Sequence, residues 1–278
     1  MTSDALPPGL YIVATPIGNL GDLSPRAAET LRGVNLVLAE DKRVSAKLLA
    51  FADAKAPMAT YHDHTSEAER DRIVARLGEQ AIALVSDAGT PLISDPGFKL
   101  VRAARAAGHA VHTIPGPSAV VAALTLAGLP TDRFLFAGFL PAKAKARADA
   151  IDEIKSVRAT LVFYESGPRL GDTLSALRDG LGDREAAVIR EISKLHEETV
   201  TGLLGDLGGR YADAGPKGEI VIVVGPPPDA AEASDEDLDA ALDEALQTLS
   251  PSRAAAEVSS RLNIPRKRAY ARALERSK

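Results

Sequence analysis

The sequence contains no cysteine and no tryptophan, and aromatic residues make up only 4% of its 278 residues. The lack of cysteine excludes disulfide bonds and metal sites with thiolate ligands. The low aromatic content argues against an extended platform on which the bases of single-stranded RNA stack. No apolar run has the length of a membrane span, and the opening MTSDALPPG lacks the basic and apolar regions of a signal peptide. We therefore expect a cytoplasmic protein that does not contact a membrane.

Short β-rich runs alternate with helical patterns in the first part of the chain. The predicted strands are residues 10–14, 34–39, 81–85 and 110–114. Ser24 and Pro25 stand where an N-cap and the first turn of a helix are expected, and Ser66 with Glu69 has the spacing of a capping box. This alternation predicts an α/β domain over residues 1–116.

A second alternating series begins at Arg133. Its predicted strands are RFLFAGF, ATLVFYE, AAVIREI and GEIVIVVG, which are nearly continuous apolar runs of the kind found in sheets covered on both faces. The series predicts a second α/β domain over residues 117–228, joined to the first near residues 115–118. The expected fold class is α/β, with two such domains and a small helical module after them.

The segment 229–278 is predicted to form an acidic linker followed by a basic helical module. Residues 229–250 carry eight acidic and no basic side chains, whereas 251–278 carry eight basic and two acidic ones, a net charge of +6. The composition of PPPDAAEASDED is typical of an extended linker. Apolar residues recur at helical spacing from Leu238 to Leu249, and further helices are predicted over 251–262 and near 266–275. This order resembles a helix-turn-helix fragment that binds a polyanion, but a helical hairpin used only for packing fits equally well.

Four predicted strands end in loops that could hold a ligand, because ligands of open α/β sheets collect at the carboxyl ends of strands. These loops are residues 14–25, 38–43, 84–97 and 113–124. The third, LVSDAGTPLISDPG, offers a carboxylate and free backbone groups beside glycine and proline. Neither G-x-G-x-x-G nor G-x-x-x-x-G-K-[ST] occurs, which disfavours a Rossmann-type fold and a P-loop. Loops of this composition also serve merely to reverse the chain, so both interpretations stay open.

A series of motifs follows one order over residues 9–225: PIGNLGDLSPRA, AEDKR, SDAGTPLISDPG, IPGPSA, GFLP, FYES, REISKLHEE and GEIVIVVG. In this order they resemble the motifs of bacterial small-subunit ribosomal RNA 2′-O-methyltransferases, and specifically the cytidine-modifying ones, within the tetrapyrrole methylase superfamily. The chain departs from that pattern at Lys42, where threonine is usual, and at Gly167 and Pro168, where proline and histidine are usual.

The resemblance implies S-adenosylmethionine bound in a cleft between the two domains, and a homodimer. It also implies methylation of a cytidine ribose in small-subunit ribosomal RNA, within the ribosomal subunit. Each implied site residue has a structural alternative as well: a proline can shape a turn, a serine can cap a helix, and a tyrosine can belong to the core. The residues implied to line the cofactor site are Pro16, Asp87, Gly89, Thr90, Pro91, Ile93, Ser118, Ala119, Tyr164 and Gly218.

Methyl transfer to a ribose hydroxyl is an in-line displacement, in which positioning supplies much of the rate. A proton acceptor or a cation beside the hydroxyl assists the reaction. We predict that Glu191, Lys194 and Arg43 activate or position the substrate, with a salt-bridge network between the domains as the alternative. A basic loop after GFLP is predicted to contact the phosphates of unpaired RNA: Lys143, Lys145 and Arg147.

The stretch YHDHTSE places His62, Asp63 and His64 in a pattern that could bind a metal. HEET, around His196, lacks the second histidine of H-E-x-x-H, so we expect no metal site. Three other functions stay open: methylation of a tetrapyrrole or other small molecule, S-adenosylmethionine sensing by a non-catalytic RNA-binding protein, and a metal-dependent phosphoesterase. The basic C-terminal segment favours an RNA substrate, because a small molecule does not need it.

Overall fold

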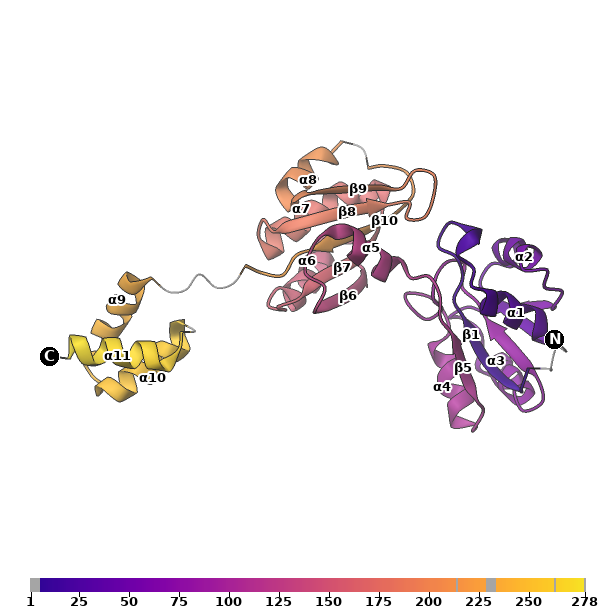
Figure 1. Cartoon of the computed structure of the whole chain (residues 1–278), viewed down its shortest axis with the longest axis horizontal. Helices are drawn as coiled ribbons and strands as arrows, with labels where there is room; N and C mark the ends of the chain where they lie inside the picture. The colour runs from indigo at the N-terminus through magenta and orange to yellow at the C-terminus, as the bar shows by residue number, and fades with distance from the viewer. Residues whose placement is uncertain (1–5, 214, 229–233, 263, 278) are drawn as a thin grey trace. The chain divides into compact units, whose positions relative to one another are not determined.

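The computed structural model describes residues 6–213, 215–228, 234–262 and 264–277. The chain divides into two compact units, Met1–Pro226 and Pro227–Lys278, and each is described by itself (Figure 1). Asp229, Glu232 and Lys278, which contributed to the charge count, lie outside the described residues, as does Asn263 in the expected break between two helices.

The large unit contains two five-stranded sheets. In the first sheet every strand pairs in parallel with its neighbours. All four strands predicted for this part of the chain are present, and β3 is an addition at the edge. In the order β3-β2-β4-β1-β5, the strands are β1 (Gly9–Val13), β2 (Leu36–Ala39), β3 (Met58–Thr60), β4 (Ala81–Leu84) and β5 (Val111–Ile114).

Helices cover both faces of the first sheet, because successive strand residues point to opposite sides. Tyr11 packs in the cluster that includes α1 and α2, whereas Leu10 packs in the cluster that includes α3 and α4. Ser24 caps α1 as expected, accepting the Ala27 N–H at 3.1 Å, and Ser66 caps α3 through the Glu69 N–H. The helices are α1 (Pro25–Gly33), α2 (Lys42–Phe51), α3 (Glu67–Arg76) and α4 (Phe98–Ala106).

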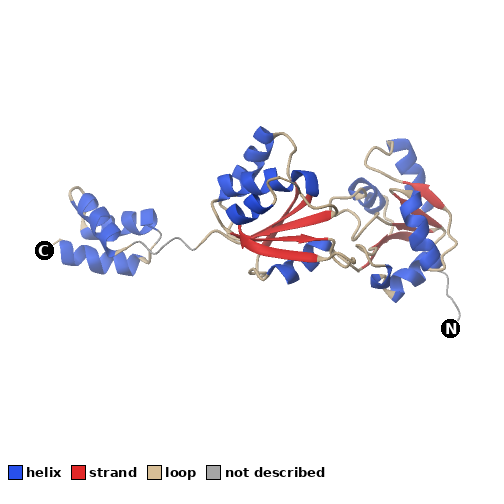
Figure 2. Ribbon diagram, turned by 90° about the horizontal axis from the view of Figure 1, so that it is seen from above, coloured by secondary structure: helices blue, strands red, loops and turns tan. Residues whose placement is uncertain are grey.

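The second sheet is mixed: β6 and β7 are parallel, and the remaining pairs are antiparallel. Helices cover both of its faces, as expected (Figure 2). The sequence analysis missed β9, an edge strand whose residues alternate between half-buried and exposed, so it lacks a continuous apolar run. In the order β6-β7-β10-β8-β9, the strands are β6 (Phe134–Phe139), β7 (Thr160–Ser166), β8 (Glu185–Arg190), β9 (Glu198–Leu203) and β10 (Glu219–Val224).

Helix α5 (Ala119–Ala127) directly follows the first sheet in the chain but packs on the second. Its Val120 and Leu124 are buried against strand residues such as Val162 and Val221. The opposite face of the second sheet carries α6 (Ala144–Ile154), α7 (Leu170–Leu181) and α8 (Leu204–Arg210). The chain therefore passes from the first sheet to the second in the loop that follows β5, close to Ser118.

The small unit is a three-helix bundle of α9 (Asp235–Leu246), α10 (Pro251–Leu262) and α11 (Arg266–Arg276). Its core contains Leu238 and Leu242 of α9, packed against alanines of the other two helices. The acidic stretch expected to continue the linker instead forms the first turn of α9. Ser234 caps this helix in a box with Asp237, and carboxylates in a first turn are stabilised by the helix dipole.

Carboxylates of the acidic helix α9 pair with three arginines of the basic helix α11, so the acidic and basic segments share one bundle. Arg272 and Arg276 of α11 both pair with carboxylates of α9, with Arg272 Nε 2.6 Å from Asp239 Oδ1. Arg268 pairs with Asp235 of α9 at 2.9 Å. Over its described residues the unit carries eight acidic and seven basic side chains, a net charge of −1. The two charge runs are complementary faces of one small bundle.

No helix of the described ranges is both long and apolar enough to cross a membrane.

Candidate active site

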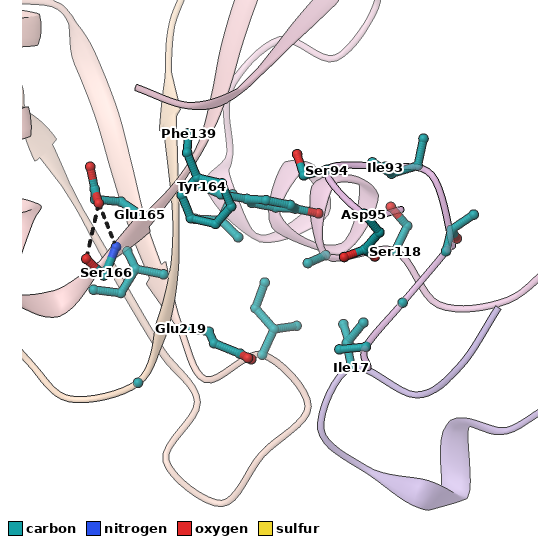
Figure 3. Close-up of a pocket in the computed structure, with 18 residues that line it drawn as sticks. Ile17, Ile93, Ser94, Asp95, Ser118, Phe139, Tyr164, Glu165, Ser166 and Glu219 are labelled. Atoms are coloured by element: carbon teal, nitrogen blue, oxygen red, sulfur yellow. Dashed lines mark hydrogen bonds between the residues drawn. The ribbon is translucent and has the colours of Figure 1, made fainter. Parts of the chain in front are cut away.

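A cavity of about 360 Å³ lies within the large unit and is lined from both sheets (Figure 3). From the first sheet come the loops after β1, β4 and β5; from the second come the ends of β6 and β7, the loop after β8, the start of β10 and the first residue of α5, which packs on that sheet. Because β10 is antiparallel to β7 and β8, its first residues meet the last residues of those strands. Ligand-facing loops of both sheets thus converge on one cavity.

The loops of the first sheet hold one another in place. Thr15 and Gly89 exchange two backbone hydrogen bonds, with N···O distances of 2.8 and 3.1 Å, which tie the loop after β1 to the loop after β4. Thr90 Oγ1 then donates to the carbonyl oxygen of Pro117 at 3.1 Å and reaches the loop after β5. These hydrogen bonds join the loops after β1, β4 and β5 into one wall of the cavity.

Backbone strain concentrates in two loops beside this cavity. Among the described residues, positive φ angles at non-glycine positions occur at Leu92, Ser94, Glu191 and Ser193, and otherwise only at Asp53. Such conformations cost of order 1–3 kcal/mol each and cluster at functional sites. Ser193 of the second loop also donates a hydrogen bond to Asp22 of the loop after β1, so the strained loop links the two sheets.

The cavity contains a carboxyl group that is hard to ionise. Burial, together with the nearby carboxylates of Glu40, Asp87 and Asp63, raises the pKa of Asp95 to about 6. Figure 3 shows Tyr164 directed across the cavity toward Asp95. Burial and the charge of Asp95 raise the pKa of Tyr164 to about 12, so its hydroxyl stays protonated at neutral pH. A cationic ligand group would relieve the repulsion around Asp95.

A buried network fixes the end of β7 at the cavity wall. The side chain of Glu165 is fully buried and accepts hydrogen bonds from Ser166 N–H at 2.8 Å and Thr173 Oγ1 at 2.7 Å. Arg169 Nε lies 3.3 Å from the same carboxylate. These contacts hold Tyr164 and Ser166 in place on either side of Glu165.

The unusual residue Gly167 has a steric reason in this chain. A Cβ atom at Gly167 would lie 1.8 Å from the carbonyl oxygen of Pro216, so no other residue fits there without moving the backbone. Lys42, which replaces the threonine usual at this position of the motif, is the exposed first residue of α2.

A second cavity of about 280 Å³ adjoins the first, and Ile17, Ala88 and Glu219 line both. Lys194 lies at its edge, with Nζ 2.9 Å from Glu191 Oε1 and 3.0 Å from Glu219 Oε2. Burial alone would lower the pKa of Lys194, but these two carboxylates raise it. The stem of Lys194 lies over Gly18, where a Cβ would be 2.4 Å from Lys194 Cγ, so Gly18 makes room for the lysine.

The structure brings most of the predicted cofactor residues together. Two of the predicted cofactor residues, Pro16 and Asp87, line the second cavity, together with the predicted catalytic residue Lys194. The residue Pro91 is buried and lines neither cavity. The predicted residues that line the first cavity are Gly89, Thr90, Ile93, Ser118, Ala119, Tyr164 and Gly218.

The other two predicted catalytic residues lie outside both cavities. Glu191 supports Lys194 from behind and also accepts the backbone N–H of Glu219 at 3.2 Å. The glycine at position 218 leaves room for this carboxylate, since a Cβ there would lie 2.4 Å from Glu191 Oε1. Arg43 has a 91% exposed side chain that pairs with Asp41 and holds the pKa of that carboxyl at about 2.

Ser118, predicted for the cofactor site with helix capping as the alternative, lines the first cavity; it occupies the N-cap position of α5 but makes no side-chain capping hydrogen bond. One local expectation was wrong. The supposed basic loop after GFLP is the start of α6, in which Arg147 is 9% exposed and therefore unable to reach an RNA phosphate. Lys143 and Lys145 remain exposed.

Sequence reasoning missed several residues that line the first cavity. All of them belong to the motifs that resemble the family or lie next to predicted cofactor residues. The motifs therefore indicated the right segments of the chain but not which of their residues line the cavity. Strand direction and pairing decide which member of a motif faces the ligand. The missed residues include Ile17, Ser94, Asp95, Phe139, Glu165, Ser166, Ile192 and Glu219.

His62 and His64 lie with ring centroids 6.2 Å apart. Within the part of the chain that the structure describes, no group of three or more histidine, aspartate or glutamate residues is arranged to hold a metal ion.

Comparison with known proteins identifies the class of protein. The family model described as Tetrapyrrole (Corrin/Porphyrin) Methylases matches residues 9–208. The chain belongs to this family. Solved structures agree in fold: uroporphyrin-III-C-methyltransferase from Thermus thermophilus has a TM-score of 0.56 at 23% identity, over 78% of this chain and 93% of that one. Diphthine synthase has a TM-score of 0.61 at 17% identity, over 78% and 89%.

Curated relatives narrow the comparison further. The protein named "Ribosomal RNA small subunit methyltransferase I" of Erythrobacter litoralis is 53% identical over 99% of this chain and 97% of its own length. The protein of the same name from Mesorhizobium japonicum is 46% identical over 97% and 92%. A model described as the RsmI C-terminal HTH domain matches residues 232–277. Membership of the tetrapyrrole methylase family, which the motifs indicated, is confirmed.

Proposed function

We propose that this chain transfers a methyl group from S-adenosylmethionine to the ribose 2′-hydroxyl of a cytidine in small-subunit ribosomal RNA. The observation that carries the proposal is the similarity to curated ribosomal RNA methyltransferases over nearly the full length of both chains. The position of the two adjoining cavities at the converging loops supports it, because a transferase needs a donor and an acceptor site side by side.

The residues of the first cavity fit S-adenosylmethionine. Ile17, Ile93 and Ile192 offer apolar walls for the adenosine. Asp95 offers a carboxylate for a cationic group of the ligand, and Gly89 and Gly218 have positive φ angles and no side chain, so the ligand can approach the backbone closely. When bound, S-adenosylmethionine supplies a methyl group activated by a positively charged sulfur.

The chain's contribution to the reaction is positioning and charge. The ammonium group of Lys194 pairs with two carboxylates. One belongs to Glu219, which lines both cavities, and the other belongs to Glu191. This ammonium group stabilises negative charge that develops on the acceptor oxygen. The Glu219 carboxylate, which lines both cavities, is placed to accept the proton of the hydroxyl. In this scheme Glu191 positions Lys194, and the exposed guanidinium of Arg43 contacts an RNA phosphate.

The remaining proposals concern assembly. We expect a homodimer that acts on ribosomal RNA within the small subunit. Because the C-terminal bundle is nearly neutral, its sequence-independent electrostatic attraction to RNA is weak. We therefore favour recognition of a folded ribosomal surface by its shape over binding of free RNA.

The test is transfer of labelled methyl from S-adenosylmethionine to isolated small subunits, naked ribosomal RNA and a tetrapyrrole precursor. Nuclease mapping of labelled RNA should yield a resistant dinucleotide with cytidine on its 5′ side, because a 2′-O-methyl group blocks cleavage. Label confined to the tetrapyrrole would overturn the RNA substrate, and cofactor binding without transfer to any of the three would favour a sensing protein.

A further inference from the structure

Helix α4 presents an exposed stripe that combines an aromatic ring with positive charge. Phe98, Arg102 and Arg105 are exposed and stand at positions i, i+4 and i+7, so they share one face of the helix. On the opposite face, Leu100 and Ala104 are buried among residues of the first sheet. Phe98 is 65% exposed, more than any other aromatic residue. The helix therefore turns a ring and two guanidinium groups toward solvent together.

The two arginines of this stripe are not neutralised by the protein. Neither Arg102 nor Arg105 forms an ion pair with any residue that the structure describes. The helix contains no acidic residue, and none occurs in the sequence from Pro96 to Thr131. Lys99 adds a third positive charge beside the stripe, and its Nζ donates to the backbone carbonyl oxygen of Asp63 at 3.5 Å. Cations that lie on one helix face without partners attract a polyanion.

The combination of groups on α4 fits RNA. A guanidinium group binds a phosphate through charge-assisted hydrogen bonds, and an exposed aromatic ring stacks on an unpaired base. A second copy of this chain fits the stripe less well, because contact of α4 with its counterpart across a twofold axis would bring like charges together. We therefore take RNA as the partner of this face.

Helix α4 begins beside the candidate active site but lies outside both cavities. Phe98 follows Asp95, which lines the first cavity, by three residues, so their Cα atoms are at most about 11 Å apart. No residue of α4 lines either cavity. Because α4 connects two strands that are both parallel to β1, it runs from their carboxyl ends back toward their amino ends. The stripe, about 10 Å long, therefore leads away from the site over the outside of the first sheet.

We propose that the exposed face of α4 binds RNA that flanks the modified nucleotide, with Phe98 stacked on an unpaired base and Arg102 and Arg105 in contact with phosphates. The inference rests on the proposed function, since it extends the contact with that RNA beyond the two cavities. It assigns to α4 a role in binding RNA and none in binding the cofactor.

The test measures binding of unmethylated small ribosomal subunits to the wild type, Phe98→Ala, Arg102→Met and Arg105→Met at several salt concentrations. Each arginine variant should weaken binding about three- to tenfold near physiological salt and reduce the slope of log K against log salt by about 1, because one phosphate contact is lost. Phe98→Ala should weaken binding about tenfold with an unchanged slope, because stacking on a base releases no counterion.

Controls separate a lost contact from a damaged protein. The Kd for S-adenosylmethionine and the unfolding midpoint should stay at the wild-type values, since all three side chains are exposed and outside both cavities. The matched variant is Arg133→Met, which removes an exposed arginine just before β6 and should leave both the affinity for subunits and its salt slope unchanged.

The outcomes separate this inference from the proposed function. If the wild type methylates RNA but the three α4 variants bind subunits as Arg133→Met does, the flanking RNA lies elsewhere and only this inference is wrong. If the variants instead dissociate a homodimer in sedimentation equilibrium, α4 contacts a second copy and the inference is again wrong. If the wild type neither binds nor methylates ribosomal RNA, the proposed function and this inference are both wrong.

Discussion

Carboxylates in the two units of this protein experience opposite surroundings. In the C-terminal bundle, Asp239 and Asp243 each pair with arginines of α11, which lower the pKa values of both carboxyls. In the cavity of the large unit, Asp95 lies near Glu40 and Asp87, and burial with these charges raises its pKa to about 6. An ionised aspartate therefore stabilises the fold of the small unit, whereas in the cavity of the large unit ionisation of an aspartate is unfavourable.

The difference separates charges that maintain the fold from charges that await a ligand. A carboxylate with a cation beside it is satisfied within the chain, so nothing further needs to bind. A partly buried carboxylate among other carboxylates gains from a cationic ligand, and such perturbed groups cluster at functional sites. For this chain, the comparison supports the proposal that the cavity around Asp95 binds the cofactor, whereas the paired arginines Arg268, Arg272 and Arg276 stabilise the small bundle.

The largest expected effect comes from Asp95→Asn. We expect it to weaken S-adenosylmethionine binding roughly 10- to 100-fold at pH 8, since a hydrogen bond to a charged group contributes about 1.5–3 kcal/mol. Isothermal titration calorimetry measures the change. The matched control is Asp53→Asn, at an exposed position outside both cavities. An unchanged Kd for Asp95→Asn would contradict this interpretation, because the carboxylate of Asp95 would then not contribute to binding of S-adenosylmethionine.

The same residue gives a prediction about stability. Its folded pKa of about 6 lies above the ordinary value of 3.8, so between these values the folded state binds more protons than the unfolded state. Stability from this group is therefore present below pH 4 and is lost as the pH rises to about 6, by roughly 2 kcal/mol. Urea unfolding of the wild type and Asp95→Asn at pH 4 and pH 7 measures it. We expect the variant to gain relative stability at pH 7; equal pH dependence of the two proteins would contradict this.

The smallest expected effect concerns the bundle. Arg272→Met removes one of the two arginine partners of Asp239 and leaves Arg276, whereas Arg266→Met alters an exposed arginine of the same helix as a control. Because these groups are solvent-accessible, we expect amide exchange in α9 and α11 to rise only about two- to fivefold, without effect on S-adenosylmethionine binding. Loss of methyl transfer to small subunits with unchanged exchange would show instead that Arg272 contacts RNA.

The two sheets and most of their strands could be predicted from the sequence, because buried strands such as GEIVIVVG are continuous apolar runs. The edge strands β3 and β9 were missed, since an edge strand need bury only one face and so has a weaker pattern. Helix starts at Ser24 and Ser66 were found because a cap depends on residues three positions apart. Ser118 carried the same signal but turns to the cavity, which no local pattern reveals.

The site was predicted at the level of motifs. Gly89, Thr90 and Tyr164 were chosen correctly as neighbours in space, but Asp95 and Glu219 were passed over although they stand within quoted motifs. Their importance depends on what lies beside them: Asp95 is perturbed by Glu40 and Asp63, which come from other loops. A sequence does not show which carboxylates meet.

The sequence by itself determined the α/β fold class, the helical nature of the C-terminal segment and the family, because these depend on local periodicity and on the order of motifs. Only the tertiary structure decided how the charges are used. Nothing in the sequence indicated that Asp235, at the end of the predicted linker, and Asp239 and Asp243, in the helical pattern after it, pair with arginines of α11 in one bundle. Electrostatic energy depends on distance in space, and pairs such as Arg272 and Asp239 are far apart along the chain but in contact in the fold.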